Sequence, residues 1–448
     1  HDSLARVAEI VEKLPSVRKV VVVPHLDPKV DVSDVPKAVT LDEWLRRYTA
    51  GDIEFAQLPF DHPLFILFTS GTTGKPKCIV HGAGGSLLQA LKMYKLHLDL
   101  KPGDRYFYFC TTNWVVWNLL FASIAAEVSV MLYDGSPFAK NARILFDYAE
   151  KERFTHFGTS AKYLDSIAKR GLKPIETHDL SALRMLVSTG SPLAPESFRY
   201  VYREIKKDVQ LSSISGGTDL VACFAQGCTI LPVYEGEIQC RALAMHVEIY
   251  DEECRPLTHE KGELVCTAPF PSMPIGFWND VDGSKYRSAY FERFPNVWWH
   301  GDYAELTPRG GVVIYGRSDA VLNPGGVRIG TAEIYRQVDQ LDEVMESIAI
   351  GQEWQNDVRV VLFVRLRAGF TLDDALRQKI RDVIRKNTTP RHVPAKIVQV
   401  ADIPRTISGK LVELAVRNVV HGKPVKNVDA LANPDALSFF RDRPELKS

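Results

Sequence analysis

Residues 67–77 read LFTSGTTGKPK, and this stretch contains the most specific local signal in the chain. It follows the apolar run Leu64–Phe68, which predicts a buried β-strand. Gly71 and Gly74 can adopt positive φ angles and let backbone N–H groups approach an anion closely. The other polar residues of the loop supply hydroxyl or ammonium donors: Thr69, Ser70, Thr72, Thr73, Lys75 and Lys77. The stretch therefore predicts a cradle for a polyphosphate.

This loop differs from a Walker A motif in two respects. The spacing between its glycines is different, and Pro76 stands where a Walker A loop needs Ser or Thr to hold Mg²⁺. The alternative interpretation is a solvated Gly/Thr turn, which is what most glycine-rich loops are. The density of donors in eleven residues favours phosphate binding over that alternative.

Composition excludes several classes of protein. The 448 residues contain 55 Lys+Arg and 55 Asp+Glu, so the formal net charge is zero, and we expect no nucleic-acid partner because phosphate binding needs a basic excess. Hydrophobic residues make up 45% and charged residues 25%, as in ordinary globular proteins. The seven cysteines form no C-x-x-C pair, which favours the reducing cytosol over a disulfide scaffold. No apolar run is long enough to predict a membrane span.

Strand and helix patterns alternate over residues 64–215, which predicts an α/β fold with mostly parallel, helix-covered sheets. A separate run, Val20–Val23, predicts a strand buried on both faces. After about residue 220, short runs separated by turn residues predict a small β subdomain. Residues 320–448 mix helices and strands, including VRVVLFVRL at 358–366, and predict a small α+β domain.

Six segments, in this order along the chain, resemble the motifs of the adenylate-forming superfamily, which includes acyl-CoA synthetases, firefly luciferases and peptide-synthetase adenylation domains. The segments are 67–77, Gly190-Ser191-Pro192, Ser215–Asp219, Trp299–Asp302, the pair Gly316–Asp319 with Gly325–Arg328, and Pro404–Lys410. A single match would be weak, but six collinear matches identify the chain as a member of this superfamily.

The resemblance implies an enzyme in which a carboxylate attacks the α-phosphorus of ATP and pyrophosphate leaves. The 67–77 loop would hold the β- and γ-phosphates, and Gly190–Pro192 and Gly217 would lie along the nucleotide. Thr218 would donate to the α-phosphate, and Asp219 would position Mg²⁺, directly or through water. A cation on a mobile domain, Lys410, would bridge the carboxylate and the α-phosphate. Asp219 replaces the Glu that is common in the superfamily, and this change keeps the carboxylate.

Two further positions are expected to hold the sugar and phosphate of the nucleotide. Asp302 can accept hydrogen bonds from both ribose hydroxyls, and Arg317 would contact ribose and phosphate. Each residue alone would be a surface polar group, and the surrounding motif is what indicates function. His81 and His300 show no catalytic pairing in the sequence and are expected to be structural.

The resemblance also implies a second half reaction, in which the thiol of coenzyme A attacks the acyl adenylate. A large domain at 1–318 and a small domain at 319–448 would rotate about a hinge at Asp319. The rotation would remove Lys410 and bring Gly325 and Gly326 toward the pantetheine tunnel, with Arg328 on the adenylate phosphate in one arrangement. Only 66 residues precede Leu67, fewer than is usual in the superfamily, so we expect the large domain to be incomplete at its N-terminus.

Substrate class depends on the segment TTNWVVW and on Gly216. Trp114 and Val115 are expected to line the acyl pocket, and Gly216 stands where acetate-activating relatives have a tryptophan, so a larger acid is expected. The sequences of several segments, such as SGGTDLVACF and NPGGVRIGTAEIY, resemble those of the acetoacetate-activating members. The expected substrates are therefore acetoacetate, ATP and coenzyme A. An acetate- or propionate-activating enzyme and a catalytically silent nucleotide-binding fragment are the alternatives.

Overall fold

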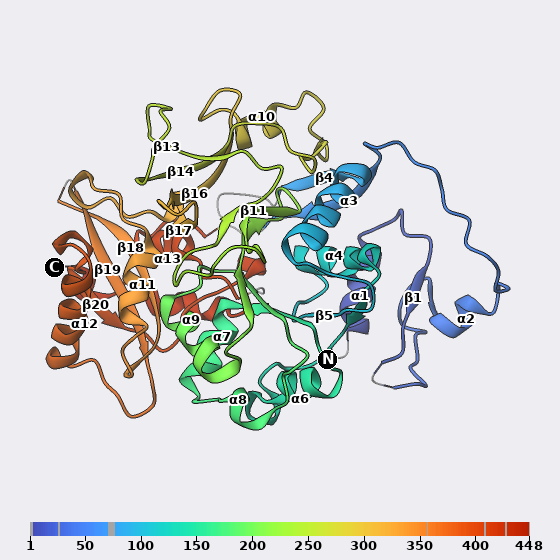
Figure 1. Cartoon of the computed structure of the whole chain (residues 1–448), viewed down its shortest axis with the longest axis horizontal. Helices are drawn as coiled ribbons and strands as arrows, with labels where there is room; N and C mark the ends of the chain where they lie inside the picture. The colour runs from blue at the N-terminus through green and yellow to red at the C-terminus, as the bar shows by residue number, and fades with distance from the viewer. Residues whose placement is uncertain are drawn as a thin grey trace. The chain divides into compact units, whose positions relative to one another are not determined.

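The computed structural model describes residues 3–25, 27–69, 77–355, 357–406, 409–425 and 428–447 (Figure 1). The chain divides into two compact units, His1–Leu58 and Pro59–Ser448. The first unit contains α1 (Leu4–Glu12), β1 (Val20–Val22), β2 (Ala38–Thr40) and α2 (Leu41–Leu45). Its two strands pair in parallel. Val21 and Val23 are exposed, so the prediction of a strand buried on both faces is wrong here, since within this unit β1 has only β2 as a strand neighbour.

A five-stranded sheet with the order β6-β5-β7-β8-β9 forms the centre of the second unit, and all its pairings are parallel. Its strands are β5 (Arg105–Tyr108), β6 (Ser129–Met131), β7 (His156–Ser160), β8 (Met185–Thr189) and β9 (Gln210–Ser213). The segments that connect or flank them contain α3 (Ala83–Lys92), α4 (Val115–Ala122), α5 (Ala139–Ala142), α6 (Ile144–Lys151), α7 (Ala161–Lys169), α8 (Pro174–Thr177) and α9 (Pro195–Tyr200).

Alternating side chains of this sheet pack on its two faces. Phe107, Phe157 and Leu186 belong to one buried cluster with residues of α6, α7 and α9. Tyr108 and Val187 belong to another with residues of α3 and α4. The strands β5, β7 and β8 are buried on both faces, as expected for parallel strands covered by helices. The predicted α/β fold is confirmed.

The strand before the phosphate loop does not join the parallel sheet. β3 (Pro63–Phe68) is an edge strand of a three-stranded antiparallel sheet with β4 (Cys78–Gly82) and β15 (Gly276–Phe277). Leu64 is 49% exposed and Phe68 65% exposed, so the prediction that this strand is buried is wrong in this structure. An edge strand pairs with one neighbour only, and the outer side chains of β3 remain open to solvent.

Two antiparallel sheets follow. One contains β10 (Ser215–Gly217), β11 (Ala222–Gln226) and β12 (Cys240–Arg241). The other contains β13 (Val247–Tyr250), β14 (Lys261–Cys266), β16 (Trp298–Leu306) and β17 (Val312–Arg317), in that spatial order, and α10 (Ser284–Tyr290) lies between β15 and β16 in sequence. These sheets correspond to the predicted β subdomain.

The C-terminal elements lie together in Figure 1, coloured orange to red. They are α11 (Thr331–Val338), β18 (Val344–Trp354), β19 (Asp357–Leu366), α12 (Asp374–Asn387), β20 (Lys396–Gln399) and α13 (Glu413–Val420). β18 and β19 pair antiparallel, and β20 joins β19 in parallel. Within the described ranges no helix has the length and apolarity needed to cross a membrane.

Candidate active site

The ends of the predicted phosphate loop meet through one backbone hydrogen bond. The N–H of Thr69 donates to the carbonyl of Lys77 at 3.2 Å, which closes the loop between β3 and β4. The loop residues predicted to donate to phosphate, Ser70, Gly71, Thr72, Thr73, Gly74 and Lys75, lie outside the described residues. Thr69 and Lys77 are therefore the described members of this predicted cradle.

Lys77 connects the loop to a distant motif. Its ammonium nitrogen lies 2.9 Å from Oδ1 of Asp219, which follows β10. The hydroxyl of Tyr290 donates to the same oxygen at 2.6 Å. Burial alone would raise the pKa of the Asp219 carboxyl, but Lys77, His300 and the Tyr290 hydrogen bond outweigh burial and hold that pKa well below its usual range. Asp219 is therefore an anion at every physiological pH.

The sequence analysis missed two aromatic residues beside this ion pair. The Lys77 ammonium lies 4.7 Å from the ring centre of Tyr290 and 5.9 Å from that of Phe277. Tyr290 also stacks on Trp298, with ring centroids 3.7 Å apart. No motif marks Tyr290 or Phe277 in the sequence, because their contact with Lys77 depends on where α10 and β15 pack.

His81 supports the other motif residue, Thr218. Its Nε2 lies 2.9 Å from the carbonyl oxygen of Thr218, and the ring is completely buried. Burial lowers the pKa of His81 to about 4, although the hydrogen bond to Thr218 and the charge of Asp219 oppose that shift. A neutral ring whose Nε2–H donates to Thr218 is consistent with the structural role expected for His81.

Asp302 and Arg317 face each other across adjacent strands. They are directly paired in the register of β16 and β17, and an Arg317 nitrogen lies 3.0 Å from Oδ1 of Asp302. The same guanidinium donates to the carbonyl of His300 at 3.0 Å. Gly301 has a φ of +80°, and a Cβ there would lie 2.8 Å from Arg317, so glycine leaves the guanidinium its place.

His300 interacts electrostatically with both ion pairs, Lys77–Asp219 and Asp302–Arg317. Its Nε2 is 3.8 Å from Oδ2 of Asp302, and its ring packs edge-on against Phe224 with centroids 4.7 Å apart. Burial lowers the pKa of His300, which Asp302 and Asp219 oppose and Arg317 and Lys77 reinforce. The Lys77–Asp219 pair and the Asp302–Arg317 pair therefore lie within electrostatic reach of one another.

Lys410 also lies near this charge cluster. Desolvation lowers the pKa of its ammonium first, the positive charge of Arg317 adds to that effect, and Asp302 and Asp219 oppose it. The residue keeps contact with solvent, so this desolvation is only partial. A hydrogen-bonded turn presents it, because the N–H of Lys410 donates to the Thr406 hydroxyl at 3.1 Å and the N–H of Thr406 donates to the Lys410 carbonyl at 2.9 Å. The C-terminal cation predicted for adenylate formation is thus within electrostatic reach of Asp302, Arg317 and Asp219.

Three other predicted groups lie at or near the carboxyl ends of the parallel strands. Gly190 follows β8 directly with a φ of +93°, and Ser191 and Pro192 continue from it. A Cβ at Gly190 would be 3.9 Å from the ring of Trp114. Val115 begins α4 and packs, like Trp114, against the buried cluster that contains Cys223. The predicted acyl-pocket residues and the predicted nucleotide segment are therefore neighbours.

The space around Gly216 is smaller than its predicted role in the acyl pocket requires. A Cβ at Gly216 would lie only 2.0 Å from the carbonyl oxygen of Ala222 on the paired strand β11. At Gly217 the nearest atom would be Nε2 of His300, at 3.7 Å. The open space expected at Gly216 is therefore absent in this structure, because the bulged β10–β11 pairing brings backbone against that position.

Arg328 and Gly325 are engaged elsewhere. Arg328 bonds to Glu263 and Glu252, and the N–H of Gly325 donates to Asp357 at 3.0 Å. Gly326 ends the 3₁₀ turn Pro324–Gly326. The predicted hinge residue Asp319 lies in another short 3₁₀ turn, Ser318–Ala320, directly after β17. In this structure Arg328 thus contacts Glu263 and the Tyr303 ring, and Gly325 contacts Asp357.

Asp219 is the residue that the sequence predicts to hold Mg²⁺. No group of three His, Cys, Asp or Glu side chains suited to a metal ion occurs in the part of the chain that the structure describes. A single hard carboxylate suits Mg²⁺ that takes its remaining oxygens from phosphate and water, which is the usual arrangement in nucleotide enzymes.

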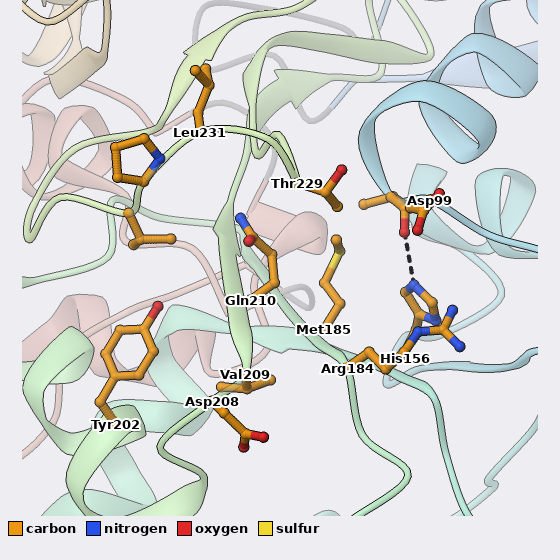
Figure 2. Close-up of a pocket in the computed structure, with 13 residues that line it drawn as sticks. Asp99, His156, Arg184, Met185, Tyr202, Asp208, Val209, Gln210, Thr229 and Leu231 are labelled. Atoms are coloured by element: carbon orange, nitrogen blue, oxygen red, sulfur yellow. Dashed lines mark hydrogen bonds between the residues drawn. The ribbon is translucent and has the colours of Figure 1, made fainter.

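A hollow of about 530 Å³ lies at the amino-terminal ends of the parallel strands, away from the predicted site residues that follow these strands (Figure 2). It is lined by the first residues of three strands, His156, Met185 and Gln210, rather than by residues that follow the strands. His156 is buried, its Nε2 lies 2.8 Å from the Leu98 carbonyl, and Arg184 forms an ion pair with Asp104 at 2.7 Å. The two groups are thus bound to a backbone carbonyl and to a carboxylate of the same unit.

Comparisons with known proteins agree with the motifs. Residues 1–274 match the AMP-binding enzyme family. The acetoacetyl-coenzyme A synthetase of Rhizobium meliloti (strain 1021) is 59% identical over 429 residues, which cover 96% of this chain and 66% of the relative. The acetoacetyl-CoA synthetase of Mus musculus is 46% identical over 454 residues, which cover all of this chain and 68% of the relative.

Solved structures give the same result. An acetoacetyl-CoA synthetase from Streptomyces lividans superposes with a TM-score of 0.91 at 42% identity, covering 100% of this chain and 68% of its own. An anthranilate CoA ligase in complex with anthranoyl-AMP superposes with a TM-score of 0.79 at 22% identity, covering 93% and 76%, which shows a shared fold. The chain spans about two thirds of the length of these acetoacetyl-CoA synthetases. With its motifs in order and its relatives this similar, the chain belongs to the acetoacetyl-CoA synthetase family of AMP-binding enzymes.

Proposed function

We propose that the protein is an AMP-forming acid–thiol ligase that converts acetoacetate, ATP and coenzyme A to acetoacetyl-CoA, AMP and pyrophosphate. The single observation that carries this proposal is the convergence of the motifs in space. Lys77, Asp219, Asp302, Arg317 and Lys410 come from widely separated segments, yet their charges influence one another. The similarity to acetoacetyl-CoA synthetases supports acetoacetate as the acid.

In the first half reaction a carboxylate oxygen of acetoacetate forms a bond to the α-phosphorus of ATP, and the bond to pyrophosphate breaks. Two anions must meet, so the site has to supply positive charge where negative charge accumulates. Lys410 would bridge the attacking carboxylate and the α-phosphate, while Thr218 would donate to the α-phosphate. Lys77, with the loop before it, would hold the β- and γ-phosphates.

The nucleotide would be oriented by the Asp302–Arg317 pair. Asp302 would accept the ribose hydroxyls, and Arg317, already 3.0 Å from Asp302, would orient that carboxylate and contact the sugar and phosphate. Gly190, Ser191, Pro192 and Gly217 would lie along the adenosine. Mg²⁺, held by Asp219 directly or through water, would neutralise the leaving pyrophosphate when bound.

In the second half reaction the sulfur of coenzyme A forms a bond to the acyl carbon, and AMP leaves. We propose that residues 319–448 move as one domain about Asp319 between the two steps. The movement would withdraw Lys410 and carry Gly325, Gly326 and Arg328 to the thiol entrance. Glycine at 325 suits that role, since its φ is +58° and a side chain would narrow the approach.

Acid-dependent exchange of labelled pyrophosphate into ATP tests the first half reaction. Full-length protein should exchange with acetoacetate and turn over fully when coenzyme A is added. A panel of acetate, propionate, butyrate and acetoacetate at equal concentration should give the highest kcat/KM with acetoacetate. Preference for acetate would identify an acetyl-CoA synthetase, and no exchange with any acid would leave a silent nucleotide-binding protein.

The partners we propose are these small molecules alone, with no nucleic acid, and the location is the cytosol. The neutral balance of charge supports the first statement. The second is supported by the seven cysteines, all of which are free thiols in the structure. Sedimentation of a fluorescent oligonucleotide with the protein at low salt would contradict the first, and fractionation of cells would test the second.

A further inference from the structure

Glu263, on β14, is a fully buried carboxylate with four donors. One oxygen accepts from Arg328 at 2.5 Å and faces Arg293 at 3.2 Å. The other accepts from the indole N–H of Trp299 at 2.8 Å and from the hydroxyl of Ser318 at 2.5 Å. Two donors on each oxygen saturate a carboxylate, which compensates the loss of water around a buried charge.

These four partners differ in their position relative to the proposed hinge at Asp319. Trp299 and Arg293 precede it and lie in the same body as Glu263, and Ser318 is the residue directly before it. Arg328 alone follows the hinge. A rotation about Asp319 would therefore leave the first two contacts unchanged and would have to break or reshape the contact between Glu263 and Arg328.

Two neighbouring residues that precede the hinge, Glu263 and Tyr303, form a binding site for the Arg328 guanidinium. Tyr303 pairs with Glu263 across β14 and β16, and the Arg328 guanidinium lies 4.7 Å from the Tyr303 ring centre. Arg328 thus stacks on the ring of one strand while it bonds to the carboxylate of the next. Two residues before Glu263, on the same face of β14, Lys261 forms a second contact across the hinge, 2.5 Å from Glu333.

In the same structure the charges of Asp302, Arg317 and Asp219 act on Lys410, and adenylate formation needs that lysine near the nucleotide residues. Seated on Glu263, Arg328 is kept from the adenylate phosphate that it would contact in the other arrangement. We infer that Glu263 is a positioning residue that favours the adenylate-forming arrangement by binding Arg328. This inference rests on the proposed function and adds the residue that sets the balance between its two half reactions.

The test compares the two half reactions in Glu263→Gln. Adenylate formation is measured by acetoacetate-dependent pyrophosphate exchange, and thioester formation by the reaction of supplied acetoacetyl adenylate with coenzyme A. The ratio of the first rate to the second should fall about tenfold, the loss expected for one charge-assisted hydrogen bond that only one arrangement makes. An unchanged ratio, or equal loss of both rates, would overturn the inference.

Glu237→Gln is the matched control. Glu237 is also a buried carboxylate that is held by an arginine and a hydroxyl, Arg309 and Thr307, but all three residues precede the hinge. Its substitution should change both half reactions equally or not at all. Arg293→Gln removes a partner of Glu263 that does not cross the hinge, and it should also leave the ratio unchanged.

Tyr303→Leu provides a second route if Glu263→Gln fails to fold. It removes the ring on which the Arg328 guanidinium stacks without leaving a buried charge, and the ratio should fall in the same direction, by about two- to fivefold. A ratio that rises or stays constant in a folded Tyr303→Leu protein would contradict the inference. If the unsubstituted protein shows no exchange with any acid, the proposed function fails instead, which distinguishes the two outcomes.

Discussion

The ammonium of Lys77 lies 2.9 Å from Oδ1 of Asp219, so residues 142 positions apart form one ion pair. The last residue of the predicted phosphate loop and the acid predicted to hold Mg²⁺ are thus a single unit before any ligand is considered. The ion pair brings a cation and an anion to the place where the polyphosphate and its metal are expected, and Lys77 lowers the pKa of the Asp219 carboxyl against the opposing effect of burial.

The Lys77–Asp219 pair is open to a double-mutant cycle. We expect Asp219→Asn and Lys77→Met each to lower the rate of acetoacetate-dependent pyrophosphate exchange by about a hundredfold, the scale of losing one group that stabilises transition-state charge. Because the two residues share one contact, the double variant should lose about 1–3 kcal/mol less than the sum of the single losses. Strict additivity of the two losses would show that the ion pair does not couple them.

Lys410→Ala should separate the half reactions. Pyrophosphate exchange should fall at least a hundredfold, since no other described cation would bridge carboxylate and α-phosphate, while supplied acetoacetyl adenylate should still react with coenzyme A. The unsubstituted protein is the control for both assays. Equal loss of both activities would contradict this division of labour.

The pH profile of adenylate formation should reflect the lowered pKa of Lys410. Desolvation and Arg317 lower the pKa of Lys410, so its positive charge should disappear at a lower pH than that of an ordinary lysine. The rate of exchange should therefore decline on the basic side below pH 10.4, the usual lysine value. Lys410→Arg retains its charge throughout, and the alkaline decline should move upward in this variant even if its maximal rate is lower.

His81 should make folding sensitive to acid. Burial lowers its pKa to about 4 in the folded protein, against about 6.5 for an unfolded histidine. The stabilisation is thus complete above pH 6.5 and is lost as the pH falls from 6.5 toward 4, by up to about 3 kcal/mol. His81→Asn keeps a donor for the Thr218 carbonyl, and its urea midpoint should fall less between pH 7.5 and pH 5.

His156 is the natural comparison, because burial lowers its pKa to about 4 as well. It lies at the opposite edge of the sheet, so His156→Asn should reduce the pH dependence of folding without changing pyrophosphate exchange. A full acid dependence of stability in His81→Asn would contradict the prediction for His81.

The buried ammonium of Lys92 should lower the free energy of unfolding. Its ammonium nitrogen is buried without a hydrogen-bond partner among the described residues, and burial lowers the pKa of Lys92 to about 8. Lys92→Met fills similar volume without a charge and should raise stability by about 1–3 kcal/mol at pH 7. The gain should shrink as the pH rises from 8 to 10.4, since both folded and unfolded lysine are then neutral. Urea unfolding at pH 7 and pH 10 measures both effects, with the exposed Lys101→Met as control.

The structure altered several expectations that rested on local sequence. The run Leu64–Phe68 reads as a buried strand, but burial depends on what covers a strand, and β3 lies at a sheet edge. Gly216 reads as open space by comparison with a tryptophan in relatives, but a bulged pairing places the Ala222 carbonyl against it. In both cases a neighbour distant in sequence or a local backbone shift decided the result.

The sequence motifs predict the charged residues of the site but not the residues that contact them. Asp302 and Arg317 were both selected from short motifs, and the register of β16 and β17 pairs them directly. Tyr290 and Glu263 were not selected, although one donates to Asp219 and the other bonds to Arg328. A single tyrosine or glutamate carries no pattern, so only its neighbours in space reveal what it does.

The sequence by itself determined the family, the α/β fold and the order of the chemical groups along the chain, because loops that bind phosphate and ribose need particular residue types at fixed local spacing. The tertiary structure decided which of these groups meet. It brings Lys77 to Asp219, pairs Arg328 with Glu263 and places Lys410 within electrostatic reach of Asp302. Such contacts join residues tens to hundreds of positions apart, and their energies depend on burial and charge that arise only when the sheets have packed.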